Sequence, residues 1–194
     1  FSGNHLSWWQ QIPSFADDYR CVAPDQRGFG RSVDVDGGPG VAAFPDDLAA
    51  LLDHLGIDRA ALVGHSMSGW TAASYATQQP NRVAALVLSG TPGGLLPVER
   101  HHELMEAGAG DLPEVDPLTP ETEFLEESIT ELNDHGPAEW TEVRPTLDER
   151  PLDADGILDA GIPVFAVAGE ADAFMPRPAV EALSDRLDGC DYEV

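Results

Sequence analysis

Positive charge is scarce in this chain of 194 residues. It contains no lysine, and its ten arginines face 35 acidic residues, which gives a formal net charge of −25. Nucleic acids and anionic membranes are bound largely through clusters of basic residues, which this composition does not supply. The sequence therefore argues against both partners and says nothing of the oligomeric state.

Long apolar runs are missing as well. No stretch approaches the ~18 to 20 consecutive apolar residues of a membrane span, so we expect no membrane segment and a cytoplasmic protein. The acid excess has a further consequence, because dense carboxylates repel one another in dilute buffer and are screened within about 3 Å in molar salt. A GC-rich genome also replaces lysine with arginine, but it does not explain the acids. We therefore expect a halophilic protein.

A serine follows a short apolar stretch in the first half of the chain. Residues 61–65 predict a buried strand, the small residues around Ser66 predict a tight turn, and residues 71–79 predict a helix. Such a turn strains the serine backbone, so that its Oγ and the next N–H, that of Met67, face one cleft. Gly64 provides the small residue needed before the serine, whereas Ser68 stands where glycine is usual. The alternative is an ordinary serine at a helix N-terminus.

A second motif lies upstream of this turn. Residues 25–32 read Asp-Gln-Arg-Gly-Phe-Gly-Arg-Ser and follow an apolar segment, 21–23, that predicts a strand. A phosphate-binding glycine loop is the alternative, but no G-x-x-x-x-G-K-[ST] pattern follows. Together the two motifs resemble those of the α/β-hydrolase family. The resemblance implies the α/β-hydrolase fold, which is a mostly parallel sheet with helices on both faces and a helical cap.

Three regions divide the chain on this interpretation. Residues 1–96 are the first part of the hydrolase core with the serine turn, 97–151 the helical cap, and 152–194 the second part of the core. In 97–151 the alternation of strands and helices stops and acids accumulate, which is also compatible with a disordered linker. One amphipathic helix is nevertheless predicted there, from Phe124, Leu125, Ile129 and Leu132. Outside it, helices are expected over 6–15, with an interruption near Pro13, and over 44–55 and 177–187, and strands over 83–88 and 164–168.

Both ends of the chain look cut when they are set against the family. The N-terminal strands and the segment with the catalytic histidine are expected to be missing, so we interpret the sequence as an internal fragment that is inactive by itself. In the family's sheet order, the strands that carry Cys21 and Cys190 lie about five places apart, or roughly 24 Å. A disulfide needs Cα atoms within about 7 Å. We expect two free, buried thiols.

The resemblance also assigns catalytic roles. Ser66 is the expected nucleophile, and Asp172 is the expected acid that orients the base, because the sequence 169–172 matches the family's G-x-x-D pattern after a strand. Glu170 is its competitor. The oxyanion hole is expected to use the backbone N–H of Met67 and, if a His-Gly pair precedes the chain, that of Phe1. No cofactor and no metal are expected.

The catalytic base is absent from its expected place. The chain has six histidines, and none follows the acid, as the order Ser, Asp, His requires. His65 is expected to serve packing, with its ring turned away from the cleft, and His5 to line the pocket at best. The others lie in the core-facing helix or in the cap: His54, His101, His102 and His135. The base is therefore expected beyond Val194.

These features predict a serine hydrolase that cleaves a small, uncharged ester, thioester or lactone through an acyl-enzyme. The serine argues against the haloalkane dehalogenases and epoxide hydrolases of the family, which carry aspartate at this turn. Carbon–carbon bond hydrolases and perhydrolases share the serine and are one alternative. A non-catalytic ligand-binding protein on the same fold is another. A histidine in a Gly-His context downstream would favour the enzyme.

Overall fold

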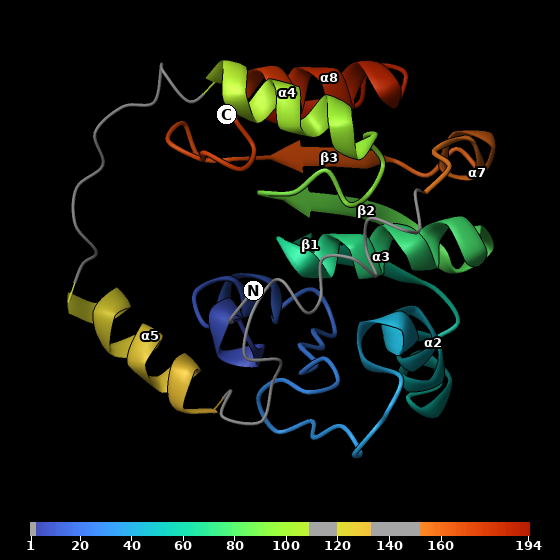
Figure 1. Ribbon diagram of the computed structural model, residues 1–194. Helices are drawn as coiled ribbons and strands as arrows, with labels where there is room; N and C mark the ends of the chain where they lie inside the picture. The colour runs from blue at the N-terminus through green and yellow to red at the C-terminus, as the bar shows by residue number, and fades with distance from the viewer. Residues whose placement is uncertain (1–2, 109–119, 133–151) are drawn as a thin grey trace. The chain divides into compact units, whose positions relative to one another are not determined.

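The computed structural model of the chain describes residues 3–108, 120–132 and 152–194 (Figure 1). These residues fall into two compact units. One combines residues 1–44 with 116–143, and the other combines 45–115 with 144–194. No helix of the described part is long and apolar enough to cross a membrane.

The larger unit, 45–115 with 144–194, is built on a parallel sheet of four strands in the order β1-β2-β3-β4. The strands are β1 (Ala60–His65), β2 (Val83–Ser89), β3 (Val164–Val167) and β4 (Asp191–Glu193). His65 pairs with Ser89, and Ser89 pairs with Val167, so the first three strands end at the same level. The continuous apolar runs that predicted β1, β2 and β3 are confirmed, and residues that follow these strands gather at one sheet edge.

Helices pack on this sheet and close its core. Helix α3 (Met67–Gln78) contacts β1 and β2, helix α8 (Arg177–Arg186) contacts β3 and β4, and α4 (Val98–Gly108) lies beside α8 (Figure 1). The short α7 (Asp155–Asp159), which the sequence did not predict, packs on α3. The largest fully buried side chains of the core are Tyr75, Leu86, Leu88, Leu95, Ile157, Met175, Leu183, Val83 and Val180.

Helix α2 (Phe44–His54) confirms the helix predicted over 44–55 and ends one residue earlier. Asp46 and Asp47 lie in its first turn, where carboxylates interact favourably with the unpaired N–H groups. Gly56 follows the helix with φ of 64°, a conformation in which glycine has no steric penalty. A 3₁₀ turn, η3 (Pro80–Arg82), leads from α3 into β2.

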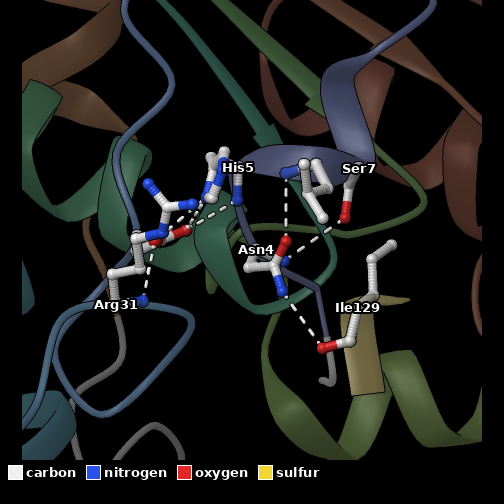
Figure 2. A network of polar contacts seen from close by, with 7 residues as sticks. Asn4, His5, Ser7, Arg31 and Ile129 are labelled. Carbon is white, nitrogen blue, oxygen red and sulfur yellow. Dashed lines mark hydrogen bonds and ion pairs between the residues drawn. The ribbon is translucent and has the colours of Figure 1, made fainter. Parts of the chain in front are cut away.

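The smaller unit contains two 3₁₀ turns, η1 (His5–Trp8) and η2 (Gly40–Ala43), and two helices, α1 (Gln11–Phe15) and α5 (Pro120–Leu132). The amphipathic helix predicted within 97–151 is confirmed as α5, and it packs against η1. The side-chain amide of Asn4 donates to the carbonyl of Ile129 over 3.1 Å (Figure 2). Asn4 Oδ1 accepts the N–H of Leu6 over 3.0 Å, so one buried side chain joins both segments.

Two local predictions in the smaller unit are wrong. The helix expected over 6–15 is interrupted, but not near Pro13: η1 ends at Trp8, and α1 begins at Gln11 and contains Pro13. The segment 21–23 is not a strand, because an extended segment becomes one only when another backbone pairs with it, and no pairing partner occurs among the described residues. Val22 is accordingly 43% exposed.

The two cysteines are free, as expected, but they are not both buried. Cys21 is exposed and Cys190 is half-buried. The expectation of a buried Cys21 failed with the predicted strand, since an apolar residue is buried only if its segment packs against others. Burial raises the pKa of the Cys190 thiol above its ordinary value of 9.0.

Candidate active site

Ser66 occupies the turn between β1 and α3, as predicted. Its backbone has φ of 52° and ψ of −125°, a combination that glycine dominates because a Cβ is strained there. The described chain holds only one other non-glycine residue at positive φ, Asp188. Strain of this kind costs on the order of 1–3 kcal/mol and is found mostly at functional positions. The turn differs from an ordinary helix N-terminus, since the Ser66 side chain makes no capping hydrogen bond.

Two glycines allow the strand and the helix to cross closely at this turn. A Cβ on Gly64 would lie 2.5 Å from the Cα of Gly69, and one on Gly69 would lie 2.3 Å from Cγ2 of Thr91. After the serine, the position that requires glycine is therefore 69 and not 68. Ser68 is compatible with the turn, because its Oγ donates to the carbonyl of His65 over 2.8 Å and accepts the N–H of His65 over 2.9 Å.

The backbone of the turn is held by the sheet and by the helix. The N–H of Ser66 donates to the carbonyl of Ser89 on β2 over 3.0 Å, and the Ser66 carbonyl accepts the N–H of Gly69 over 3.0 Å. Met67 is the first residue of α3, and the first N–H groups of a helix have no partner within it. Such N–H groups favour negative charge. Phe1, the other expected oxyanion donor, lies outside the described residues.

Asp172 follows β3 in a loop that fixes its carboxylate. Oδ1 accepts the backbone N–H groups of Phe174 over 2.9 Å and of Met175 over 3.0 Å, and the N–H of Asp172 donates to the carbonyl of Gly169 over 2.9 Å. Both of these bonds to the carboxylate end on Oδ1. The competing acid, Glu170, is exposed.

Gly90, the residue directly after β2, separates Asp172 from the end of β1. Its φ is 58°, and a Cβ there would lie 3.0 Å from Oδ2 of Asp172 and 3.3 Å from Cε1 of His65. The glycine therefore leaves room beside Oδ2. Ser66 and Asp172 follow β1 and β3, whose axes lie roughly 10 Å apart across β2.

The histidines lie as follows in the described part of the chain. His65 is exposed and does not fill the core; its Nδ1 lies 3.2 Å from Oγ of Ser89. His101 is buried, and its Nε2 donates to the carbonyl of Phe174 over 2.7 Å. His135 lies outside the described residues. None of the hydrogen bonds found among the described residues joins a histidine to the Ser66 hydroxyl.

The loop at 25–32 belongs to the smaller unit and is architectural. The carboxylate of Asp25 accepts the N–H of His5 over 2.7 Å and that of Arg31 over 2.9 Å, and His5 Nδ1 lies 2.8 Å from Oδ1 (Figure 2). A Cβ on Gly30 would collide with this carboxylate at 2.3 Å. Burial alone raises the pKa of Asp25, but the hydrogen bonds from Arg31 and His5 outweigh it and hold the pKa below its ordinary value of 3.8.

Comparison with known proteins identifies the family. A family model described as "alpha/beta hydrolase fold" matches residues 1–148. The chain belongs to the α/β-hydrolase fold family. The resemblance inferred from the serine turn and the 25–32 loop is thus confirmed.

Two curated members of this α/β-hydrolase family illustrate the sequence relationship. The chain is 38% identical over 88 residues to a bifunctional esterase/perhydrolase of Acinetobacter calcoaceticus, a stretch that covers 44% of the chain and 32% of the relative. It is also 38% identical over 97 residues to the 2-hydroxy-6-oxo-6-phenylhexa-2,4-dienoate hydrolase of Comamonas testosteroni, covering 48% and 33%. The matched part therefore spans about a third of each of these hydrolases.

Solved α/β-hydrolase structures match nearly the whole chain. A thermophilic esterase of Thermogutta terrifontis is 25% identical, with a TM-score of 0.71, and the match covers 99% of this chain and 76% of the esterase. The enol-lactonase of Burkholderia xenovorans is 22% identical, with a TM-score of 0.72 and coverage of 98% and 78%. At 22% identity, the likeness to the enol-lactonase shows that the two proteins share the fold.

Proposed function

We propose that the full-length protein is a serine hydrolase that cleaves a small, uncharged ester, thioester or lactone through an acyl-enzyme. The observation that carries the proposal is the strained backbone of Ser66, at φ of 52° and ψ of −125° between β1 and α3. A protein gains nothing structurally from a strained serine with no capping bond, whereas a nucleophile must stand clear of its own backbone.

The chemistry assigned to these residues is acyl transfer. Ser66 Oγ attacks the carbonyl carbon and its proton passes to a base, which then gives the proton to the leaving alcohol or thiol. Water hydrolyses the acyl-serine in the second half of the reaction. The N–H of Met67 stabilises the oxyanion, with the N–H of Phe1 as the second donor. Asp172 orients the base, a histidine that we place outside this chain.

The comparisons support this class of reaction. One relative is an esterase/perhydrolase and another a dienoate hydrolase, and the second name describes a small-molecule substrate. Epoxide hydrolases from Caenorhabditis elegans and Siraitia grosvenorii are also similar, at 37% and 40% identity. The family's epoxide hydrolases carry aspartate where this chain has Ser66. The serine at this turn therefore favours acyl transfer over epoxide opening.

Turnover of short-chain p-nitrophenyl esters by the full-length protein tests the proposal. We expect Ser66→Ala to lower kcat by about 10⁶ and Asp172→Asn by about 10⁴, because the members of a triad act as a unit. Glu170→Gln is the matched control, since it also removes one carboxylate from the same loop, and it should leave kcat unchanged. Activity that survives Ser66→Ala would overturn the proposal, and loss in Glu170→Gln with none in Asp172→Asn would transfer the acid role to Glu170.

A further inference from the structure

His101 is a buried histidine for which the catalytic scheme so far has no use. It lies on α4, near the middle of the chain, and is only 6% exposed. Burying an imidazole is unfavourable unless its polar atoms are hydrogen-bonded. Its Nε2 lies 2.7 Å from the carbonyl oxygen of Phe174. A carbonyl only accepts hydrogen bonds, so Nε2 carries the proton and donates.

The accepting carbonyl belongs to the loop that carries Asp172. Phe174 lies two residues beyond Asp172, and its N–H donates to Asp172 Oδ1. The same residue thus fixes the carboxylate through its N–H and is fixed by His101 through its carbonyl. The two rings meet edge to face, with centroids 4.7 Å apart and an angle of 84° between their planes. This contact restrains the side chain of Phe174 as well as its backbone.

A second contact between α4 and this loop lies one residue beyond Met175. Gly108, at the end of α4, is so close to Pro176 that a Cβ on the glycine would lie 2.5 Å from the proline Cβ. Helix α4 therefore touches the loop on both sides of Met175, which is 1% exposed.

We propose that His101 is a positioning residue for Asp172, acting through the carbonyl of Phe174. The inference rests on the proposed role of Asp172 as the acid that orients the base. A carboxylate that is displaced or freed to rotate stabilises the cationic base less well, so that the pKa of the base falls and the transition state loses stabilisation. Displacements of about 1 Å at a catalytic group cost up to about 10²-fold in rate.

Substitutions at His101 in the full-length protein test this role. His101→Leu removes the donor and the ring and should lower kcat for a p-nitrophenyl ester about 10- to 100-fold with little change in KM. The acid limb of the kcat/KM–pH profile should move to lower pH. His101→Gln keeps an N–H donor at a similar reach and should restore kcat to within a few-fold of the parent. Leu104→Ala, which removes another buried side chain of α4, should lower the melting temperature without moving the pH limb.

A double-mutant cycle separates the failure of this inference from that of the proposed function. If His101 acts through Asp172, His101→Leu should cost little in an Asp172→Asn background, because the interaction is already lost. An equal loss of kcat in both backgrounds, or an unmoved pH limb in His101→Leu, would overturn the positioning role while leaving Asp172 as the acid. If Asp172→Asn alone changes nothing, the proposed role of Asp172 fails first, and this inference fails with it.

Discussion

Relief of backbone strain at Ser66 provides a test that does not depend on knowing the substrate. Ser66→Gly and Ser66→Ala both remove the hydroxyl, but only glycine removes the Cβ that is strained at φ of 52° and ψ of −125°. The strain costs about 1–3 kcal/mol, and the greater freedom of glycine in the unfolded chain opposes its relief by about 0.5–1 kcal/mol. Ser66→Gly should therefore raise the free energy of unfolding by roughly 0.5–2 kcal/mol.

Thermal unfolding of the full-length variants, followed by circular dichroism, measures this difference. A gain of 0.5–2 kcal/mol corresponds to a rise in Tm on the order of 2–6 °C, whereas Ser66→Ala should melt within about 1 °C of the parent because the Ser66 side chain makes no capping bond. Gly64→Ala should do the opposite, since its Cβ would meet the Cα of Gly69 at 2.5 Å. Equal melting temperatures for Ser66→Gly and Ser66→Ala would refute the claim that the turn is strained.

Three further predictions follow from other parts of the chain. Gly90→Ala should abolish esterase activity, because the methyl group would lie 3.0 Å from Asp172 Oδ2; Gly161→Ala, at nearly the same φ but with nothing within 4 Å, should stay active, and equal activities would contradict this. Asp25 has a lowered pKa, so its stabilising effect is present at neutral pH and is lost as the pH falls below its ordinary value of 3.8. In acid titrations, the Asp25→Asn variant should then have a lower free energy of unfolding at pH 7 than the parent, and this free energy should change less with pH below 3.8. An unchanged acid transition would show that this carboxylate contributes nothing. Melting temperature should rise from dilute buffer to molar KCl, because 35 acidic residues face ten arginines; a flat or falling Tm would remove the halophile interpretation.

Local sequence patterns predicted those parts of the fold whose signals are local. Apolar runs located β1, β2 and β3, helical periodicity located α2, and the small residues around Ser66 located the turn between β1 and α3. The predicted strand at 21–23 failed because periodicity reports the apolar character of a segment and not whether a partner pairs with it.

The candidate site was predictable only in part for the same reason. Ser66 and Asp172 could be placed from motifs, but the contact between His101 and Phe174 joins residues 73 positions apart, on α4 and after β3. A lone histidine on a helix carries no signal that it will meet a distant carbonyl. Likewise, the sequence pattern places the small residue at position 68, whereas in the structure it is Gly69 that must lack a Cβ. The reason is the neighbouring side chain of Thr91, which the sequence alone does not place there.

Trapping of an acyl-enzyme tests the central claim most directly. The full-length protein would be mixed with p-nitrophenyl acetate, quenched in acid within the first turnovers, and analysed as intact protein and as peptides by mass spectrometry. We predict the added mass of one acetyl group on the peptide that contains Ser66, and its absence in Ser66→Ala. Steady ester turnover with an acetyl group on another residue, or with the same labelling in Ser66→Ala, would contradict the assignment of Ser66 as the nucleophile.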